Sequence, residues 1–366
     1  MSFRSRRTSG AARWALVGVV ALCMLAPSPS AKGAMMDLLL PLPDVAIPPA
    51  QGKTLSSDII EIDQKAHLMY FADRTSGGVD VFDIRTPSAK YVKTISTQSP
   101  PNGVMLAKNV NKLFVGVGNT AGTAPGGIAI IDIDPGSMTH DTVIATISTG
   151  GKKRADEGDY DPVDKKLYIA SSDDGLVQVV DATSNRLIKT WKDMGEGLEQ
   201  PRYNPSDGMM YMTSSDQNLL FQFDPRSDAL VKKFPVGVPC DPNGLAINPK
   251  TDQAILGCSD KKANQTVLWD LKAGKVAATF PDVWAGDAAA YSAKDNVFFF
   301  AAANRPTGAM LGVFTGGPGV RYAGGASTFV GSHAVAYDET NRVVYTQDQR
   351  PNSARMFAFF LATVPK

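Results

Sequence analysis

The chain has 366 residues, of which 43% are hydrophobic and 20% are charged. That composition supplies ample material for a buried core and excludes an intrinsically disordered chain. The 33 glycines and 24 prolines favour a fold with many turns. A chain of this length could form two ordinary domains or one large all-β domain.

The first 34 residues have the composition of a secretory signal peptide. A basic start with four arginines precedes an apolar run at 14–26 (WALVGVVALCMLA), and small residues suited to cleavage follow at 27–34. The apolar run is too short to span a membrane comfortably. We therefore predict export to the periplasm or the extracellular space, with residues 35–366 as the mature chain and no membrane span in it.

Removing this leader would leave 32 Lys and Arg against 36 Asp and Glu, a net charge of about −4. A mildly acidic protein has no general attraction for nucleic acid or anionic lipid, so nucleic acid is not an expected partner. Only Cys240 and Cys258 would remain. If the strands between them pair around the turn at 248–252, Cys258 falls opposite about residue 243. We predict a disulfide, the alternative being two small buried apolar residues.

One unit, a polar entrance followed by two apolar strands around a polar turn, occurs seven times. The units begin near residues 57, 101, 156, 198, 241, 286 and 332. Their spacing matches the period of a four-stranded propeller blade. A third strand usually ends in Asp, as in VDVFD at 79–83, and a more polar fourth strand follows. Since no long amphipathic helical period occurs, we predict an all-β, seven-bladed β-propeller of four-stranded antiparallel blades.

The last unit has only three strands before the chain ends, whereas residues 38–49 (LLLPLPDVAIPP) belong to no unit. We expect this N-terminal segment to form the outer strand of the last blade. That pairing closes the ring and covers an exposed sheet edge. Prolines are tolerated on such an outer strand.

Residues 167–191 (LYIASSDDGLVQVVDATSNRLIKTW) resemble the repeat of the YncE-like, or YVTN, seven-bladed propellers, and the resemblance extends over residues 55–366. These are exported proteins of mostly unsettled function, so the resemblance implies a fold rather than an activity. Entrances such as PNGV at 101–104 and DPNGLA at 241–246 are also similar to those of gluconolactonase and regucalcin-like propellers. In that usually six-bladed family, Glu, Asn and Asp at such entrances hold a divalent metal. Virginiamycin B lyase is a seven-bladed relative with catalytic His and acid groups at similar entrances.

The first strand of each blade is innermost, so its first residues should meet around the central channel. The equivalent residues are Asp58, Asn102, Glu157, Glu199, Asn243, Asp287 and His333. An oxygen-rich ring suits a hard cation such as Ca²⁺ or Mg²⁺, which would relieve the crowding of carboxylates. By analogy with those relatives, we assign Glu157, Glu199, Asn243 and Asp287 as metal ligands and His333 as the catalytic proton carrier.

Further residues at the channel mouth are candidates for binding a ligand. Asp58, Asn102 and Arg202 form this group, and Arg74, Arg154 and Arg305 could likewise contact an anionic substrate. The alternative is structural, because polar residues at strand entrances also cap turns and bind channel water. The motifs of zinc, c-type haem and G-x-S-x-G sites are missing, and the loose glycine pattern at 116–121 precedes no helix. We expect no haem, flavin or nucleotide.

Two functions stay open at this point. One is metal-dependent hydrolysis, lactonase-like, or lyase chemistry on a small molecule. The other is a non-enzymatic binding or scaffold protein of the cell envelope that holds a protein partner on a propeller face. In either case we expect a monomer.

Overall fold

The structure is a computed structural model that describes residues 38–260, 262–263, 265–284, 286–303 and 308–363. The chain divides into two units, Met1–Met35 and Met36–Lys366, and only the second is described below. The predicted signal peptide and Arg305 therefore lie outside the described residues. Of the helices in the described ranges, none has the length and apolarity needed to cross a membrane.

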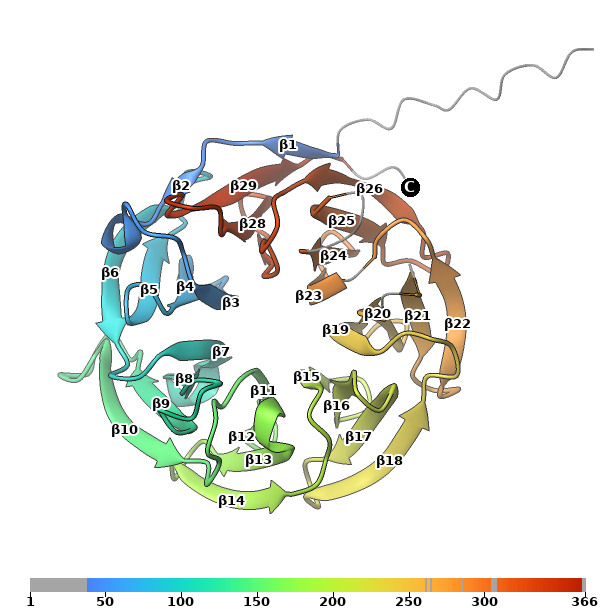
Figure 1. Cartoon of the computed structure of the whole chain (residues 1–366), viewed down its shortest axis with the longest axis horizontal. Helices are drawn as coiled ribbons and strands as arrows, with labels where there is room; N and C mark the ends of the chain where they lie inside the picture. Colours follow the sequence, from blue (N-terminus) through green and yellow to red (C-terminus); the bar gives the residue numbers. More distant parts are fainter. Residues whose placement is uncertain (1–37, 261, 264, 285, 304–307, 364–366) are drawn as a thin grey trace, which may run out of the picture. The chain divides into compact units, whose positions relative to one another are not determined.

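Seven antiparallel sheets are arranged in a ring within this unit, and each sheet runs outwards from the centre (Figure 1). In the first three sheets the strands are β3 (Ser57–Asp63), β4 (Leu68–Asp73), β5 (Gly78–Asp83) and β6 (Lys90–Ser96); β7 (Pro101–Ala107), β8 (Lys112–Val117), β9 (Gly127–Asp132) and β10 (Thr142–Ser148); and β11 (Gly158–Asp161), β12 (Lys166–Ser171), β13 (Leu176–Asp181) and β14 (Arg186–Trp191). The predicted all-β, seven-bladed propeller is confirmed.

The next three blades continue the same order. Their strands are β15 (Leu198–Asn204), β16 (Met209–Ser214), β17 (Leu219–Asp224) and β18 (Ala229–Pro235); β19 (Pro242–Asn248), β20 (Gln253–Cys258), β21 (Thr266–Asp270) and β22 (Lys275–Phe280); and β23 (Gly286–Ser292), β24 (Val297–Ala302), β25 (Met310–Thr315) and β26 (Tyr322–Ser327). Helix in the described residues is limited to three single 3₁₀ turns, η1 (Pro48–Ala50), η2 (Lys108–Val110) and η3 (Ser172–Asp174).

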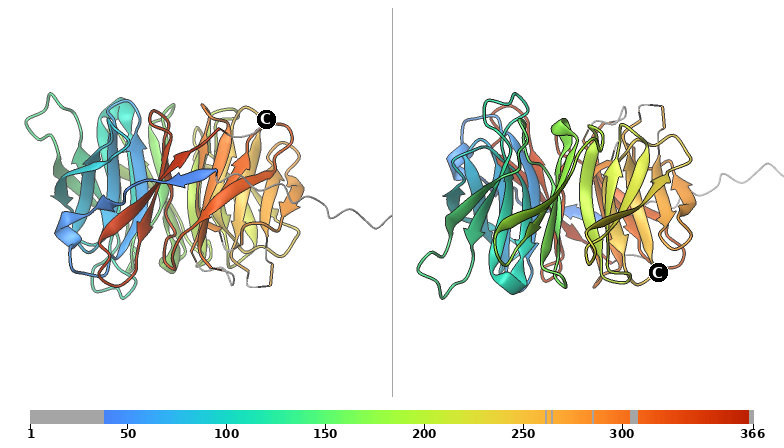
Figure 2. Two further views of the ribbon diagram at one scale, coloured as in Figure 1. Left: turned by 90° about the horizontal axis from the view of Figure 1, so that it is seen from above. Right: turned by 90° about the horizontal axis from the view of Figure 1, so that it is seen from below.

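The seventh blade joins the two ends of the described chain. It consists of β27 (Ala336–Asp338), β28 (Val343–Asp348) and β29 (Arg355–Leu361), with β1 (Leu39–Pro41) and β2 (Val45–Ala46) paired to β29 on its outer side. Leu39 lies opposite Leu361, and Val45 lies opposite Met356. Figure 2 shows β1, in blue, lying along the red strand of this blade. Ring closure by an N-terminal strand is therefore confirmed, and Pro41 lies on an edge strand as its missing N–H requires.

Two inner strands begin later than the sequence predicts. β11 begins at Gly158 rather than at Asp156, and β27 begins at Ala336 rather than at Ser332. In the third blade the backbone bonds still continue, because Asp156 N donates to Ala170 O over 2.8 Å. In the seventh blade a side chain takes the place of a backbone acceptor: Ala334 N donates to Gln347 Oε1 over 2.9 Å.

The hydrophobic core lies between neighbouring blades rather than at the ring centre. Between the sixth and seventh blades, for example, Phe299, Val344 and Leu361 are fully buried against each other. Towards the channel, small residues let the inner strands approach closely. A Cβ atom on Gly244 would come closer than 3.0 Å to the carbonyl oxygen of Asp287 in the next blade. This packing leaves the central channel to be lined by the inner strands.

Candidate functional site

The structure brings most of the predicted entrance residues to one cavity of about 200 Å³. Its lining comprises Asp58, Arg74, Arg154, Asp156, Glu157, Glu199, Asn243, Asp287 and His333. Six of the seven predicted entrance residues are in this set. Asn102 is absent from it because its side chain is fully buried beside the cavity.

Bulges in the inner strands aim several of these side chains at the channel. The pairing of β3 with β4 shifts register between Ser57 and Ile60, so Asp58 lies within the bulge. The same irregularity precedes Leu245 in β19 and Ala289 in β23, where Asn243 and Asp287 lie. A bulge leaves residues out of the regular ladder and redirects their side chains.

Asp58 is the centre of an ion-paired arc of the ring. Its carboxylate accepts a hydrogen bond from Arg74, lies 3.4 Å from His333 Nε2 and lies 3.6 Å from Arg154 Nη1. Burial alone would raise the pKa of Asp58, but His333, Arg74 and Arg154 together hold it well below its ordinary value. Asp58 is therefore ionised at neutral pH and shared by three cationic side chains.

Asn102 and Asp156 fix the two arginines. Asn102 Oδ1 accepts hydrogen bonds from Arg74 Nε and Nη2 at 3.0 and 2.8 Å, and its amide nitrogen donates to the carbonyl oxygen of Ala155 over 3.0 Å. Arg154 Nη2 lies 2.7 Å from Asp156 Oδ2. Asn102 is thus a positioning residue for Arg74 rather than a group that lines the cavity.

His333 is held as an imidazolium. Its Nδ1 lies 2.8 Å from the carbonyl oxygen of Gly331 and its Nε2 faces Asp58, so both ring nitrogens meet hydrogen-bond acceptors. Burial alone would lower the pKa of His333, but the hydrogen bond and charge of Asp58, with the charge of Asp287, raise it to about 9. A protonated imidazole can donate a proton at neutral pH but cannot accept one.

The other arc carries the four predicted metal ligands, and it differs from the first in having no cations. Glu157, Glu199, Asn243 and Asp287 come from four consecutive blades. Within the described residues, their side chains form no ion pair of 4.0 Å or less, and Glu157 Oε2 is buried without a hydrogen-bond partner.

The pKa values of the carboxyl groups in this second arc are raised. The pKa of Glu157 is raised well above its ordinary value by burial and by the charges of Asp58, Asp156 and Asp287. The pKa of Glu199 is raised likewise by burial and by Glu157. Burial also raises the pKa of Asp287. A cation that enters the cavity would stabilise the ionised forms of these groups.

The donor chemistry of this arc matches a hard cation, since it consists of three carboxyl groups and one amide oxygen. These donor groups are not placed as in a formed metal site. In the described part of the chain, no three His, Cys, Asp or Glu side chains are arranged to share one metal ion. A cation held here would draw these side chains inward.

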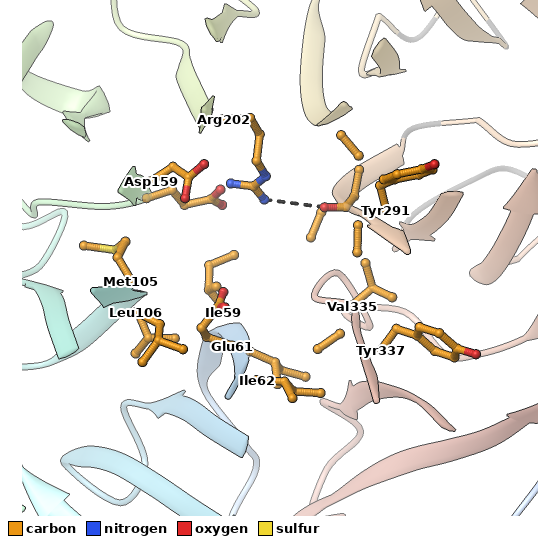
Figure 3. Close-up of a pocket in the computed structure, with 18 of the residues that line it drawn as sticks. Ile59, Glu61, Ile62, Met105, Leu106, Asp159, Arg202, Tyr291, Val335 and Tyr337 are labelled. Carbon is orange, nitrogen blue, oxygen red and sulfur yellow. Dashed lines mark hydrogen bonds between the residues drawn. The ribbon is translucent and has the colours of Figure 1, made fainter. Parts of the chain in front are cut away.

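Arg202 lies elsewhere in the channel than the sequence predicts. It lines a second cavity of about 410 Å³, further along the channel, together with Glu61 and Asp159 (Figure 3). Burial and the charge of Asp159 raise the pKa of Glu61 to about 7, against the opposing charge of Arg202. Glu157 lines both cavities. Sequence reasoning missed Glu61 and Asp159, because the entrance bulges break the alternation that would reveal which later residues of the inner strands face the channel.

Cys240 and Cys258 are joined by a disulfide. Cys258 lies opposite Pro242 in the β19–β20 pair, one position from the expected partner. Both cysteines are fully buried. The bridge ties the start of the inner strand that carries Asn243 to its neighbour.

Comparisons with known proteins support the fold and nothing finer. No protein-family model and no curated protein matches the chain. Among solved structures, a chain of the crystal structure of the mitotic checkpoint complex is similar, with a TM-score of 0.70 and 15% sequence identity. The match covers 94% of this chain and 98% of that one. At this identity the likeness establishes a shared β-propeller fold.

Proposed function

We propose that this β-propeller binds a divalent cation, Ca²⁺ or Mg²⁺, at one end of its central channel. Glu157, Glu199, Asn243 and Asp287 are the proposed ligands. The observation that carries the proposal is that these carboxyl groups form no ion pair of 4.0 Å or less among the described residues, and that Glu157 Oε2 is buried without a hydrogen-bond partner. Buried carboxylates in that state are costly unless they are protonated or meet a cation.

Charge balance in the cavity supports the same proposal. Five carboxyl groups line it, whereas three cationic side chains do so: Arg74, Arg154 and His333. If all five were ionised, the lining would carry two uncompensated negative charges. One divalent cation would cancel both, and the alternative is two bound protons.

Chemistry on a small molecule is the extension of this proposal. A cation bound here would polarise a substrate carbonyl or activate a water molecule. His333 would supply a proton to a leaving group, since its contacts favour the imidazolium form. It would not act as the base at neutral pH, so a lactonase-like or lyase reaction would need a different base.

The test compares thermal unfolding of the metal-free protein with and without Ca²⁺, Mg²⁺ or Mn²⁺. A cation at one hundred times its Kd should stabilise the folded state by about 2.7 kcal/mol. Glu199→Gln and Asp287→Asn should abolish this response. They should also stabilise the metal-free protein at neutral pH, because each removes a half-buried carboxyl group that must take up a proton or keep its charge beside other carboxyl groups on folding.

Glu196→Gln is the matched control, since Glu196 is exposed outside the cavity lining. It should leave the cation response unchanged. The proposal is wrong if the protein is metal-free by elemental analysis as purified and none of the three cations shifts its unfolding temperature.

A non-enzymatic binding or scaffold role is the second candidate. The observation that favours it is the spacing of the acidic arc, in which no three described His, Cys, Asp or Glu side chains are placed to share an ion. On this hypothesis the carboxyl groups stay protonated and the ring serves stability. The protein would then show no cation response and would bind a protein partner through a propeller face.

A further inference from the structure

The larger cavity is a second candidate site, and its lining shares Glu157 with the proposed cation site. It has a volume of about 410 Å³ and receives residues from the inner strands of all seven blades. Ligand pockets of small molecules begin at about this size. Figure 3 shows side chains from opposite sides of the channel converging on it.

About half of the surface of this cavity is apolar. Ile59, Met105, Leu106, Val335 and Tyr337 contribute hydrocarbon or aromatic surface to it. The hydroxyl of Tyr337 is turned to another partner, because it donates to Asp295 Oδ2 over 2.7 Å. The wall therefore offers a ligand an apolar surface.

Arg202 brings a positive charge to the same space. Its guanidinium donates to the carbonyl oxygen of Pro201 over 2.7 Å, to Gln200 Oε1 over 3.3 Å and to Ala289 O over 3.4 Å. All three acceptors are neutral. Among the described residues, Arg202 forms no ion pair of 4.0 Å or less. Hydrogen bonds to neutral acceptors thus hold the guanidinium in place, but no direct contact with a carboxylate compensates its charge.

Three carboxyl groups lie near Arg202, and none of them forms an ion pair with it among the described residues: Glu61, Glu157 and Asp159. Asp159 accepts hydrogen bonds from the backbone N–H groups of Tyr160 and Tyr203, at 2.8 and 2.7 Å, which hold it in place. Glu61 comes from the first blade and lines the cavity as well. The charges of Asp159 and Arg202 act on Glu61, although no ion pair joins these groups. Glu61 lies across the cavity from Arg202 (Figure 3), so the space between these two opposite charges can hold a ligand that carries both.

We propose that this cavity binds a small zwitterion with an apolar substituent, the class of apolar amino acids and their short peptides. The ligand carboxylate would meet Arg202, its ammonium group would meet Glu61 and Asp159, and its side chain would lie on the apolar wall. A simple anion would be repelled by the carboxylates. A simple cation would be repelled by Arg202, and a neutral hydrocarbon would leave these charges desolvated. The proposal does not depend on the cation site.

Isothermal titration calorimetry in EDTA, at a pH above the pKa of about 7 of Glu61, tests this proposal with a matched set of probes. Phenylalanine and leucine carry both charges, phenethylamine lacks the carboxylate, and 3-phenylpropionate lacks the ammonium group. The amino acids should bind at least tenfold more tightly than the two singly charged probes. EDTA keeps the outcome separate from that of the cation proposal.

Substitutions of single side chains test which of them contact the ligand. Glu61→Gln keeps the shape of the side chain and should weaken phenylalanine binding at least tenfold, and Arg202→Met should do the same. Glu196→Gln should leave the affinity unchanged, and circular dichroism should show that each variant is folded. The inference is overturned if phenylalanine and leucine do not bind, if the singly charged probes bind equally well, or if Glu61→Gln binds phenylalanine with unchanged affinity.

Discussion

His333 should titrate far above an ordinary histidine, and this can be measured directly. The contacts with Asp58 and Gly331 favour the imidazolium and raise the pKa of His333 to about 9. Replacing Asp58 by Asn removes the nearest negative charge. Burial would then dominate, so the pKa of His333 should fall to 6.5 or below in the variant.

The size of the coupling follows from the difference between folded and unfolded pKa values. An unfolded histidine titrates near 6.5, so the folded-state pKa of about 9 corresponds to about 3 kcal/mol. This is an upper bound, since 20% of the side chain is exposed. The folded state binds the proton more tightly, so this stabilisation is complete below pH 6.5. It decreases as the pH rises and is lost above pH 9.

The assay is an NMR titration of the imidazole protons, which is tractable because the chain has three histidines. His333→Gln identifies the relevant signal. Denaturant unfolding of the protein and of His333→Gln, at several pH values between 6 and 10, supplies the free energies. Their difference should be near 3 kcal/mol at pH 6 and should approach zero above pH 9.

A titration midpoint of 6.5 or lower for His333 in the unsubstituted protein would refute the reasoning. So would a stability difference from His333→Gln that does not change with pH. Either result would mean that Asp58 is satisfied by Arg74 and Arg154 alone, and it would restore His333 as a candidate base.

Three further predictions concern the scaffold of the channel. Leu39→Ala should lower the free energy of unfolding by 2–5 kcal/mol in chemical denaturation, because Leu39 is buried in the closing strand. Replacing Cys240 and Cys258 by Ser should cost about 3 kcal/mol for a loop of 18 residues, and the same loss should follow reduction of the unsubstituted protein with dithiothreitol. Gly244→Ala should be destabilising and should change the cation response, because the new methyl group would press on the backbone of Asp287.

The sequence predicts the fold well because the signal repeats seven times. A polar entrance, an apolar strand pair and a period near that of one blade are local features, and repetition makes them reliable. Closure was predictable for a related reason: the last unit lacks a strand that residues 38–49 could supply. The pairing partner of Cys258 was also close to the expected position, because a turn of known length fixes the register.

The chemistry of the ring was harder to predict, because repetition says nothing about what breaks the symmetry. Arg74 lies in the connection after β4, and Arg154 lies in the connection between β10 and β11. Neither position repeats, so no periodic pattern shows that both reach Asp58. Asn102 occupies an equivalent position to Asp58 but has turned to hold Arg74 instead. Equivalent positions in the repeat therefore have different roles, which depend on the residues around them.

This loss of symmetry determines where in the channel a positively charged ligand can bind. The cationic side chains gather around Asp58 in the first blade, with His333 of the seventh blade beside it. The third to sixth blades then contribute Glu157, Glu199, Asn243 and Asp287, which form no ion pair of 4.0 Å or less among the described residues. A positively charged ligand should therefore bind off the axis, against these four blades. A centred ion would face the arginines across the channel and would lose part of the attraction that the acidic arc supplies.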